Sequence, residues 1–184
     1  MKNLEPLIKT YHDFPRKGVA FKDMLGIMQD TEVFRELIFK MSSDNIIKNS
    51  EAIISIEARG FIFGSAISLQ ASKPMLVARK PGKLPGELIQ ENYSLEYGKS
   101  SLSIQKEALK KFNSYAIVDD LLATGGTVDC VANLLKKSDK EVCGLVTVVE
   151  LLELNGRSRF SFPVNSIVSI WISENVFDHF QKVL

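Results

Sequence analysis

Two carboxylates followed by a loop of small residues form the stretch of this chain best suited to chemistry. Asp119 and Asp120 come directly after the apolar run Tyr115 to Val118, and small residues lead on to Thr127, where a helical pattern begins. The pattern predicts a strand that ends at the acids, then a turn and a helix start. The unpaired N–H groups and positive dipole end of that helix would face the loop. We therefore expect an anion, most simply a phosphate, to bind there.

The acid pair must serve another part of the ligand. A carboxylate beside a phosphate is repelled unless it accepts hydrogen bonds, so Asp119 and Asp120 should face hydroxyl groups or a metal. A sugar with neighbouring hydroxyls and a phosphate satisfies both halves of the site. A solvated turn is the alternative. The loop lacks the Gly-x-Gly-x-x-Gly and Gly-x4-Gly-Lys-Ser/Thr patterns, which disfavours a dinucleotide site or an ATP P-loop.

This stretch resembles the phosphoribosyl pyrophosphate (PRPP) signature of the type I phosphoribosyltransferases, in the Val-Asp-Asp-Leu-Leu-Ala-Thr-Gly-Gly-Thr form of the adenine phosphoribosyltransferases. The resemblance implies that the acids contact the ribose hydroxyls and that the loop holds the 5-phosphate. The implied PRPP-binding residues are Asp119, Asp120, Ala123, Thr124, Gly125, Gly126 and Thr127.

A second strand, polar turn and helix pattern contains Arg59. Residues 52–56 are mostly apolar, Glu57-Ala58-Arg59-Gly60 follows, and a helical pattern continues from Phe61. Arg59 would then lie at a strand's carboxyl end, where open α/β sheets bind ligands. A surface salt bridge with Glu57 is one interpretation, and a guanidinium bound to a second phosphate is the other. The segment resembles the family's pyrophosphate loop, which favours the second.

A basic loop follows the predicted strand Met75 to Ala78. Residues 79–86 read Arg-Lys-Pro-Gly-Lys-Leu-Pro-Gly, and their prolines and glycines exclude a helix. A nucleic-acid patch is disfavoured because the loop holds no aromatic side chain that could stack on a base. The loop resembles the family's pyrophosphate-binding Arg-Lys-x-Gly-Lys-Leu-Pro-Gly. This implies that Arg79 and Lys83 bind pyrophosphate and that, in a dimer, one of them serves the neighbouring site.

Apolar and polar residues alternate over 93–99 and 101–105 about a connection that contains glycine, and they predict a mobile hairpin. On alternation alone, Glu96 would be a solvated strand carboxylate. Ser-Leu-Glu-Tyr-Gly, however, resembles the family's flexible catalytic loop. The resemblance implies that Glu96 handles the proton on the purine N7 and that Tyr97 helps to close the site.

An aromatic and apolar segment, residues 13–23, is interrupted by Pro15 and Gly18 and is predicted to be irregular. Before it, the helical spacing of apolar residues from Leu4 to Tyr11 predicts a short amphipathic helix. From composition alone, the aromatic side chains of this segment would plug the edge of the core.

Asp-Phe-Pro-x-x-Gly-x-x-Phe-x-Asp in the same segment resembles the amino-terminal hood that covers the base in adenine phosphoribosyltransferases. It implies adenine binding by Ala20, Phe21 and Lys22, through stacking and backbone groups, with residues 1–30 as the hood. Two positions depart from the family pattern. Lys17 replaces a proline and Ala20 a larger aliphatic residue, and the smaller wall would loosen base selectivity.

The remaining elements follow from periodicity. Asp30 is the predicted N-cap of a helix that ends at a polar region, residues 42–50. A helix stripe follows Thr127, and strands are predicted at 144–151 and 164–171. Leu154-x-Gly-Arg157 resembles a later family motif, and residues 174–184 receive no role.

The whole chain is ordinary for a globular protein. It has 184 residues, 45% of them hydrophobic, and a net charge of +1, which gives no general attraction to nucleic acid or membrane. Cys130 and Cys143 lack Cys-x-x-Cys spacing and suit buried, reduced thiols. The two histidines give no convincing metal site. With no signal core and no membrane-length apolar run, the sequence predicts a cytoplasmic protein.

Together the motifs imply one domain, residues 1–184, with the α/β type I phosphoribosyltransferase fold: a mostly parallel sheet flanked by helices, a small hood and a flexible catalytic hairpin. The implied reaction is adenine plus PRPP, carried with Mg²⁺, giving AMP and pyrophosphate, in a homodimer that uses neither nucleic acid nor membrane. A non-catalytic regulator that senses PRPP or nucleotide on the same fold is the alternative. Guanine or xanthine is the alternative base.

Overall fold

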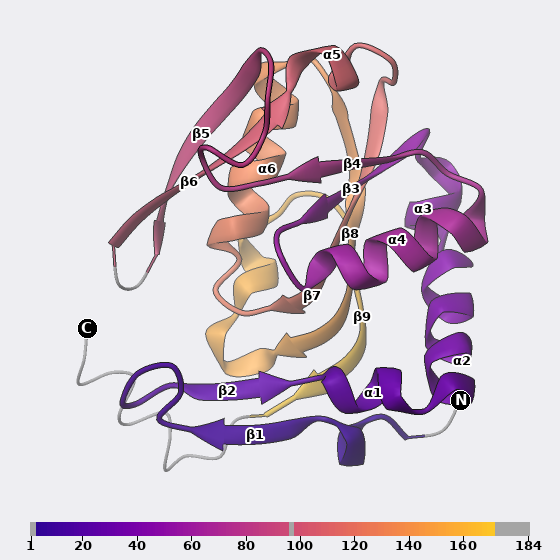
Figure 1. The fold of residues 1–184 in the computed structure, drawn as a ribbon, viewed down its shortest axis with the longest axis vertical. Helices are drawn as coiled ribbons and strands as arrows, with labels where there is room; N and C mark the ends of the chain where they lie inside the picture. The colour runs from indigo at the N-terminus through magenta and orange to yellow at the C-terminus, as the bar shows by residue number, and fades with distance from the viewer. Residues whose placement is uncertain (1–2, 96–97, 172–184) are drawn as a thin grey trace.

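The computed structural model describes residues 3–95 and 98–171 and is built on a five-stranded parallel sheet in the order β4-β3-β7-β8-β9 (Figure 1). The strands are β3 (Ala52–Ile56), β4 (Met75–Ala78), β7 (Ser114–Leu122), β8 (Glu141–Leu151) and β9 (Val164–Ile170). The helices are α1 (Leu25–Gln29), α2 (Thr31–Ser42), α3 (Asn45–Asn49), α4 (Gly60–Ala71), α5 (Lys106–Leu109) and α6 (Gly126–Lys137). This is the predicted α/β fold.

Alternate residues of the central strands point to two separate cores. In β7, Ala116 and Val118 join the core under α1 to α4, whereas Tyr115 and Ile117 join the core under α6. A parallel sheet with helices on both faces buries both sides of its strands, which explains their nearly continuous apolar sequences. The carboxyl ends of β3, β7 and β8 therefore meet at one edge, where the candidate motifs lie.

The hood is a two-stranded antiparallel sheet of β1 (Lys9–His12) and β2 (Ala20–Asp23), with Tyr11 opposite Phe21. The predicted helix from Leu4 to Tyr11 is therefore wrong, and only the turn η1 (Glu5–Leu7) is helical. The prediction that residues 13–23 are irregular is wrong for β2. A short isolated helix is marginal, and pairing between β1 and β2 satisfies the backbone groups instead. Figure 1 shows the hood near the ends of β8 and β9.

The predicted hairpin is confirmed as β5 (Leu88–Leu95) paired with β6 (Gly98–Gln105). It is longer than predicted, and Gly98 lies in β6 instead of the connection. Glu96 and Tyr97, the predicted catalytic residues, lie outside the described residues. The hairpin is joined to the main sheet by a backbone bridge, in which Arg79 and Ser103 exchange N–H···O bonds of 3.0 and 2.7 Å.

Three further boundaries of helices and strands can be set against the predictions: one agrees and two differ. Asp30 caps α2 as predicted, because its carboxylate accepts from the N–H groups of Glu32 and Val33. The region after α2 was predicted to be only polar, yet α3 forms there because Asp44 caps it. β7 continues past the acid pair to Leu122, since β8 supplies backbone partners that far.

Both cysteines carry free thiols. Cys130 is buried, as predicted, and burial raises its pKa to about 11. Cys143 is only partly buried, so the prediction of a buried thiol is wrong at this position. In the part of the chain that the structure describes, no helix has the length and apolar character needed to span a membrane.

Candidate active site

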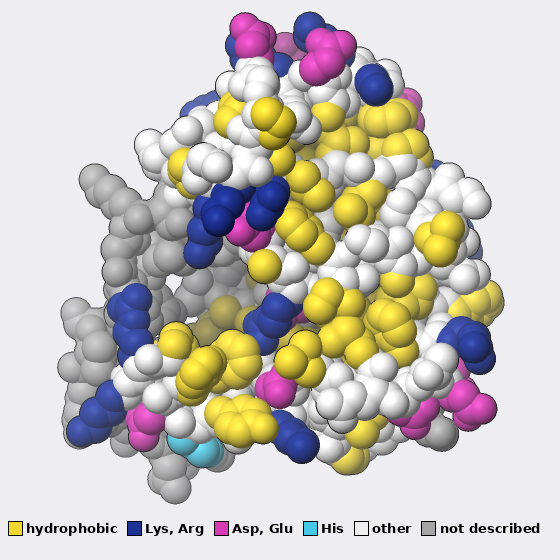
Figure 2. Space-filling view, viewed as in Figure 1, with side chains coloured by type: hydrophobic (Ala, Val, Ile, Leu, Met, Phe, Trp, Pro, Cys, Tyr) yellow, Lys and Arg dark blue, Asp and Glu magenta, His cyan; other side chains and the backbone are white. Residues whose placement is uncertain are grey.

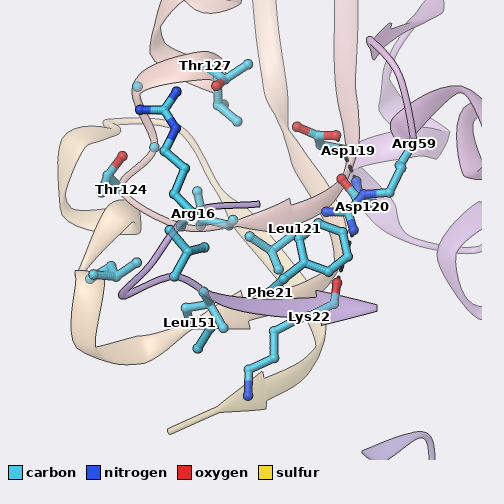
Figure 3. A pocket seen from close by; sticks show the side chains of 18 residues that line it. Arg16, Phe21, Lys22, Arg59, Asp119, Asp120, Leu121, Thr124, Thr127 and Leu151 are labelled. Atoms are coloured by element: carbon cyan, nitrogen blue, oxygen red, sulfur yellow. Dashed lines mark hydrogen bonds and ion pairs between the residues drawn. The ribbon is translucent and has the colours of Figure 1, made fainter. Parts of the chain in front are cut away.

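A cavity of about 400 Å³ lies between the hood and the carboxyl ends of β7 and β8 (Figure 3). It brings together hood residues, the acid pair, the glycine loop and Arg59. The predicted site residues that line it are Ala20, Phe21, Lys22, Arg59, Asp119, Asp120, Ala123, Thr124, Gly125, Gly126 and Thr127. Three segments far apart in the sequence therefore share one site.

The glycine loop presents open backbone at the start of α6. Gly125 occupies the left-handed region with φ of +82°, and a Cβ there would lie 2.9 Å from the Gly156 carbonyl oxygen, so glycine is required. No side chain caps the helix. The first N–H groups of α6 thus keep their hydrogen-bonding capacity, and the helix dipole adds positive potential. This geometry suits an anion.

The acid pair is buried beside that loop. Asp119 and Asp120 are 8% and 7% exposed, and Asp119 Oδ1 accepts from the Asp120 N–H at 2.9 Å. Burial, followed by the Asp120 charge, raises the pKa of Asp119 well above its ordinary value, while Arg59 opposes the rise. Two adjacent carboxylates removed from water are costly without a ligand that donates hydrogen bonds to them.

Arg59 contacts both the acid pair and the hood. Its Nε lies 2.6 Å from Asp120 Oδ2, and its Nη1 donates to the Lys22 carbonyl at 3.0 Å. Its guanidinium also stacks on the Phe21 ring, 4.6 Å from the centroid. The interpretation of Arg59 as a surface partner of Glu57 is therefore wrong. Arg59 instead fastens the hood to the end of β7.

The other two predicted cations, Arg79 and Lys83, lie outside the cavity lining. Arg79 Nε is 3.2 Å from Glu57 Oε2, and its Nη1 donates to the Lys83 carbonyl at 3.2 Å. Glu57 also accepts from the Lys80 N–H at 2.9 Å. Burial would raise the pKa of Glu57, but these hydrogen bonds and cations lower it below the ordinary value. The Glu57 carboxylate thus holds the basic loop in place through its contacts with Arg79 and Lys80.

Lys22 contributes backbone and not its ammonium group to the cavity. Figure 3 shows its side chain turned away, and its Nζ donates to Thr10 Oγ1 at 2.9 Å. Burial lowers the pKa of Lys22, with partial compensation by the charge of Glu153. Phe21 presents its ring to the cavity and meets Phe14 edge to face, with centroids 5.2 Å apart.

Sequence reasoning missed several lining residues. Arg16 extends from the hood toward Thr124 and Thr127 in Figure 3, and a charged residue between proline and lysine in a loop carried no recognisable signal. Leu151 and Leu154 form an apolar part of the cavity wall. The only signal for Leu154 was the Leu-x-Gly-Arg motif, to which no ligand contact was assigned.

Comparison with known proteins places these features in a family. A family model described as phosphoribosyl transferase domain matches residues 27–176. A protein named adenine phosphoribosyltransferase from Prochlorococcus marinus (strain MIT 9515) is 69% identical over 163 residues, covering 89% of this chain and 95% of the relative. One of that name from Clostridium perfringens is 42% identical over 167 residues, covering 90% and 97%.

Solved structures agree. Adenine phosphoribosyltransferase from Thermoanaerobacter pseudethanolicus superposes with a TM-score of 0.84 at 34% identity, covering 91% of this chain and 98% of that one. The Saccharomyces cerevisiae enzyme, complexed with an imino-altritol bisphosphate and adenine, gives 0.81 at 32% identity, covering 90% and 96%. The chain therefore belongs to the phosphoribosyl transferase domain family, in the group of the adenine phosphoribosyltransferases.

Proposed function

We propose that this protein transfers the 5-phosphoribosyl group from Mg²⁺-PRPP to adenine and releases AMP and pyrophosphate. The observation that carries the proposal is the composition of one cavity: a hood with an aromatic ring, a buried acid pair and a helix-start loop that suits a phosphate. A flat aromatic base, a ribose and a 5-phosphate need these three surroundings in this order. The membership of the adenine group supports the choice of acceptor.

The loop and the acids hold the sugar. The N–H groups at the start of α6, with Thr124 and Thr127, bind the 5-phosphate, while Asp119 and Asp120 accept hydrogen bonds from the ribose hydroxyls. Ribose hydroxyls donate hydrogen bonds to Asp119, and these replace the hydrogen bonds to water that the carboxylate loses on burial. Because sugar and base are fixed before bond breaking, part of the barrier is met by orientation.

Pyrophosphate leaves on the other side of the ribose. Arg59, Arg79 and Lys83 are proposed to bind it together with the Mg²⁺ that PRPP carries, since Mg²⁺ favours phosphate oxygens and water over an all-protein cage. Arg59 reaches this position by exchanging Asp120 for a phosphate oxygen. Arg59, Arg79 and Lys83 would share with the ion the neutralisation of negative charge on the leaving group.

The base lies between Phe21 and the apolar wall of Leu151 and Leu154. Phe21 stacks on the purine, and backbone groups of Ala20 and Lys22 read its edge. Ala20 is 8% exposed, so a small side chain limits the cavity on that side. The apolar walls add little discrimination between purines, and backbone hydrogen bonds carry the preference for adenine.

Bond breaking at the anomeric carbon builds positive charge on the ribose ring, as in glycoside cleavage. Glu96 is proposed to take the proton from the purine as the new bond forms, a role worth about 10²- to 10⁴-fold in rate. Tyr97 is proposed to exclude water, whose attack on the donor is the competing reaction. Both roles are carried over from the family motif.

We further propose one catalytic domain over residues 1–184, acting in the cytoplasm as a homodimer. The free thiols of Cys130 and Cys143 suit a reducing compartment. Figure 2 shows hydrophobic side chains gathered over the face that carries α4, where Ile62 and Leu69 are 36% and 84% exposed. A second copy on this face would cover them.

A base panel tests the proposal: adenine, guanine, hypoxanthine, xanthine and orotate, each with PRPP and Mg²⁺, with nucleotide product measured by chromatography. AMP from adenine alone is the expected result. Product only with another base would overturn the choice of acceptor. Tight PRPP binding by calorimetry without product from any base would instead identify a non-catalytic regulator.

A further inference from the structure

The turn η3 (Gly156–Arg159) packs against the glycine loop through the backbone of Gly156 and the side chain of Arg159, whose Cδ would lie 3.1 Å from a Cβ on Gly125. Gly156 is buried, and a Cβ added to it would fall on the Ala123 carbonyl oxygen and lie 3.1 Å from the Gly125 nitrogen. In the other direction, a Cβ on Gly125 would lie 2.9 Å from the Gly156 carbonyl oxygen. The two loops are therefore packed at the closest separation that glycine permits, so a shift of η3 must shift the glycine loop.

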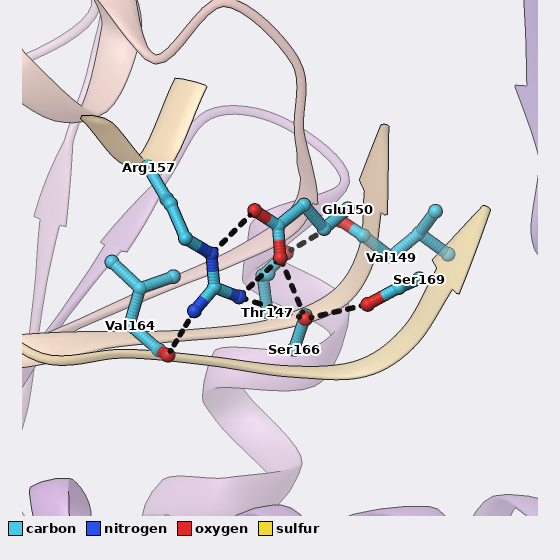
Figure 4. A network of polar contacts seen from close by, with 7 residues as sticks. All are labelled: Thr147, Val149, Glu150, Arg157, Val164, Ser166 and Ser169. Atoms are coloured by element: carbon cyan, nitrogen blue, oxygen red, sulfur yellow. Dashed lines mark hydrogen bonds and ion pairs between the residues drawn. The ribbon is translucent and has the colours of Figure 1, made fainter. Parts of the chain in front are cut away.

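Arg157 fastens η3 to the central sheet (Figure 4). Its Nε donates to Glu150 Oε1 at 2.7 Å and its Nη2 to Glu150 Oε2, while its Nη1 donates to the Val164 carbonyl at 3.3 Å. A two-pronged contact of this kind fixes direction as well as distance. The guanidinium thus joins η3 to β8 and to the first residue of β9.

The carboxylate that receives Arg157 is itself held in place. Glu150 is 2% exposed near the carboxyl end of β8, and Ser166 Oγ donates to its Oε2 at 2.9 Å. Hydrogen bonding by Arg157, the largest influence, and by Ser166 lowers the pKa of Glu150. Glu150 is therefore charged at neutral pH and binds Arg157 from a rigid strand.

We propose that the pair Glu150 and Arg157 positions the 5-phosphate loop: it holds η3 beneath Ala123 and Gly125 so that the α6 N–H groups keep the geometry for the 5-phosphate of PRPP. The inference rests on the proposed function, because that function assigns the ligand of the loop. Neither Glu150 nor Arg157 lines the cavity. Both are positioning residues and act through the contact between η3 and the glycine loop.

Two independent changes test this role in the full-length protein. Arg157→Gln breaks the contact with Glu150, whereas Gly156→Ala leaves that ion pair and pushes directly on Ala123. Each should raise the KM for PRPP and the Kd for ribose 5-phosphate by about 10- to 100-fold, the size expected for a small misplacement of a binding group. The KM for adenine should stay unchanged. Glu150 and Arg157 contact each other, Val164 and Ser166, and these contacts do not involve the hood that covers the base.

A conservative variant and a control separate positioning from stability. Arg157→Lys keeps the charge without the two-pronged contact and should give a smaller rise in both constants. Lys73→Met removes bonds from Lys73 Nζ to the Lys48 and Ser50 carbonyls, away from the cavity. It should lower Tm without changing the KM for PRPP.

The proposal is overturned if the Arg157 and Gly156 variants lower Tm as Lys73→Met does and keep the wild-type Kd for ribose 5-phosphate. It is also overturned if the KM values for adenine and PRPP rise together, which would indicate general loosening. Calorimetry with ribose 5-phosphate needs no turnover. A wild-type protein that binds this ligand but forms no AMP would refute the proposed reaction and still allow the positioning test.

Discussion

Replacing Asp119 by asparagine is expected to stabilise the ligand-free protein while it weakens PRPP binding. Asp119 is buried next to Asp120, and burial raises its pKa. Its charged form therefore costs folding free energy that a neutral amide does not. Asparagine keeps the Oδ1 acceptor that receives the Asp120 N–H. The Asp119 carboxylate is thus expected to serve ligand binding while it lowers the stability of the fold.

The size of each effect follows from the same contacts. Neutralising buried charge of this kind stabilises proteins by about 1–4 kcal/mol, and we expect about 1–2 kcal/mol because Arg59 already offsets part of the charge. With an m-value of about 2 kcal/mol per molar, the urea midpoint rises by about 0.5–1 M. Loss of a charged hydrogen bond to a ribose hydroxyl costs about 1.5–3 kcal/mol, or about 10- to 100-fold in the Kd for PRPP.

The gain in stability should depend on pH. A carboxyl whose folded-state pKa is raised contributes stability that is fully present below its unfolded-state pKa of about 4 and is lost as pH rises through the folded-state value. The advantage of Asp119→Asn is therefore largest at neutral pH and shrinks as pH falls toward 4. Urea unfolding without ligand, from pH 4.5 to 7.5, measures this trend.

Asp120→Asn is the matched control. Asp120 Oδ2 lies 2.6 Å from Arg59 Nε, so this substitution leaves a partly buried guanidinium without its counter-charge. It should give no gain at neutral pH and a loss of up to about 3 kcal/mol. If Asp119→Asn proves less stable than wild type at pH 7, or if its advantage does not change with pH, the account of the buried acid pair is wrong.

Three further outcomes are expected. Glu96→Gln should lower kcat by about 10²- to 10⁴-fold and keep the Kd for PRPP, and near-normal turnover would remove Glu96 from proton transfer. Arg16→Ala should raise the KM for PRPP by about tenfold, since a cation that extends toward the phosphate loop is lost; an unchanged KM would place Arg16 beyond the ligand. Gly64→Ala should destabilise the fold by about 1–3 kcal/mol in urea unfolding, because its Cβ would lie 2.6 Å from buried Ser55 Cβ; an unchanged midpoint would contradict this packing.

Much of the site was predictable because many of its residues follow one another in the sequence. The acids, the glycine loop and the start of α6 lie between Asp119 and Thr127, so their relation depends on local backbone rules. The rule that ligands bind at the carboxyl ends of parallel strands also predicted the correct edge of the sheet for Arg59. Both predictions needed only the order of strand, turn and helix.

Contacts between distant segments were not predictable in the same way. Arg59 pairs with Asp120 and the hood and not with nearby Glu57, because Asp120 and Phe21 reach it only in the folded chain. The hood strands were predicted as helix and loop because Pro15 and Gly18 interrupt the sequence between them. Whether β1 and β2 form strands depends on their pairing with each other, which a local pattern does not reveal. Arg16 had no pattern at all, and its position follows from the hood's placement over the glycine loop.

The proposed role of Arg59 in binding pyrophosphate would make the two substrates dependent on each other. Its guanidinium stacks on Phe21 and pairs with Asp120. A donor that draws Arg59 toward its pyrophosphate changes the electrostatic surroundings of the ring that meets the base. By thermodynamic reciprocity, the factor by which PRPP alters adenine affinity equals the factor by which adenine alters PRPP affinity. In the proposed reaction, one side chain shared between two subsites would thus couple donor and acceptor without any movement of the sheet.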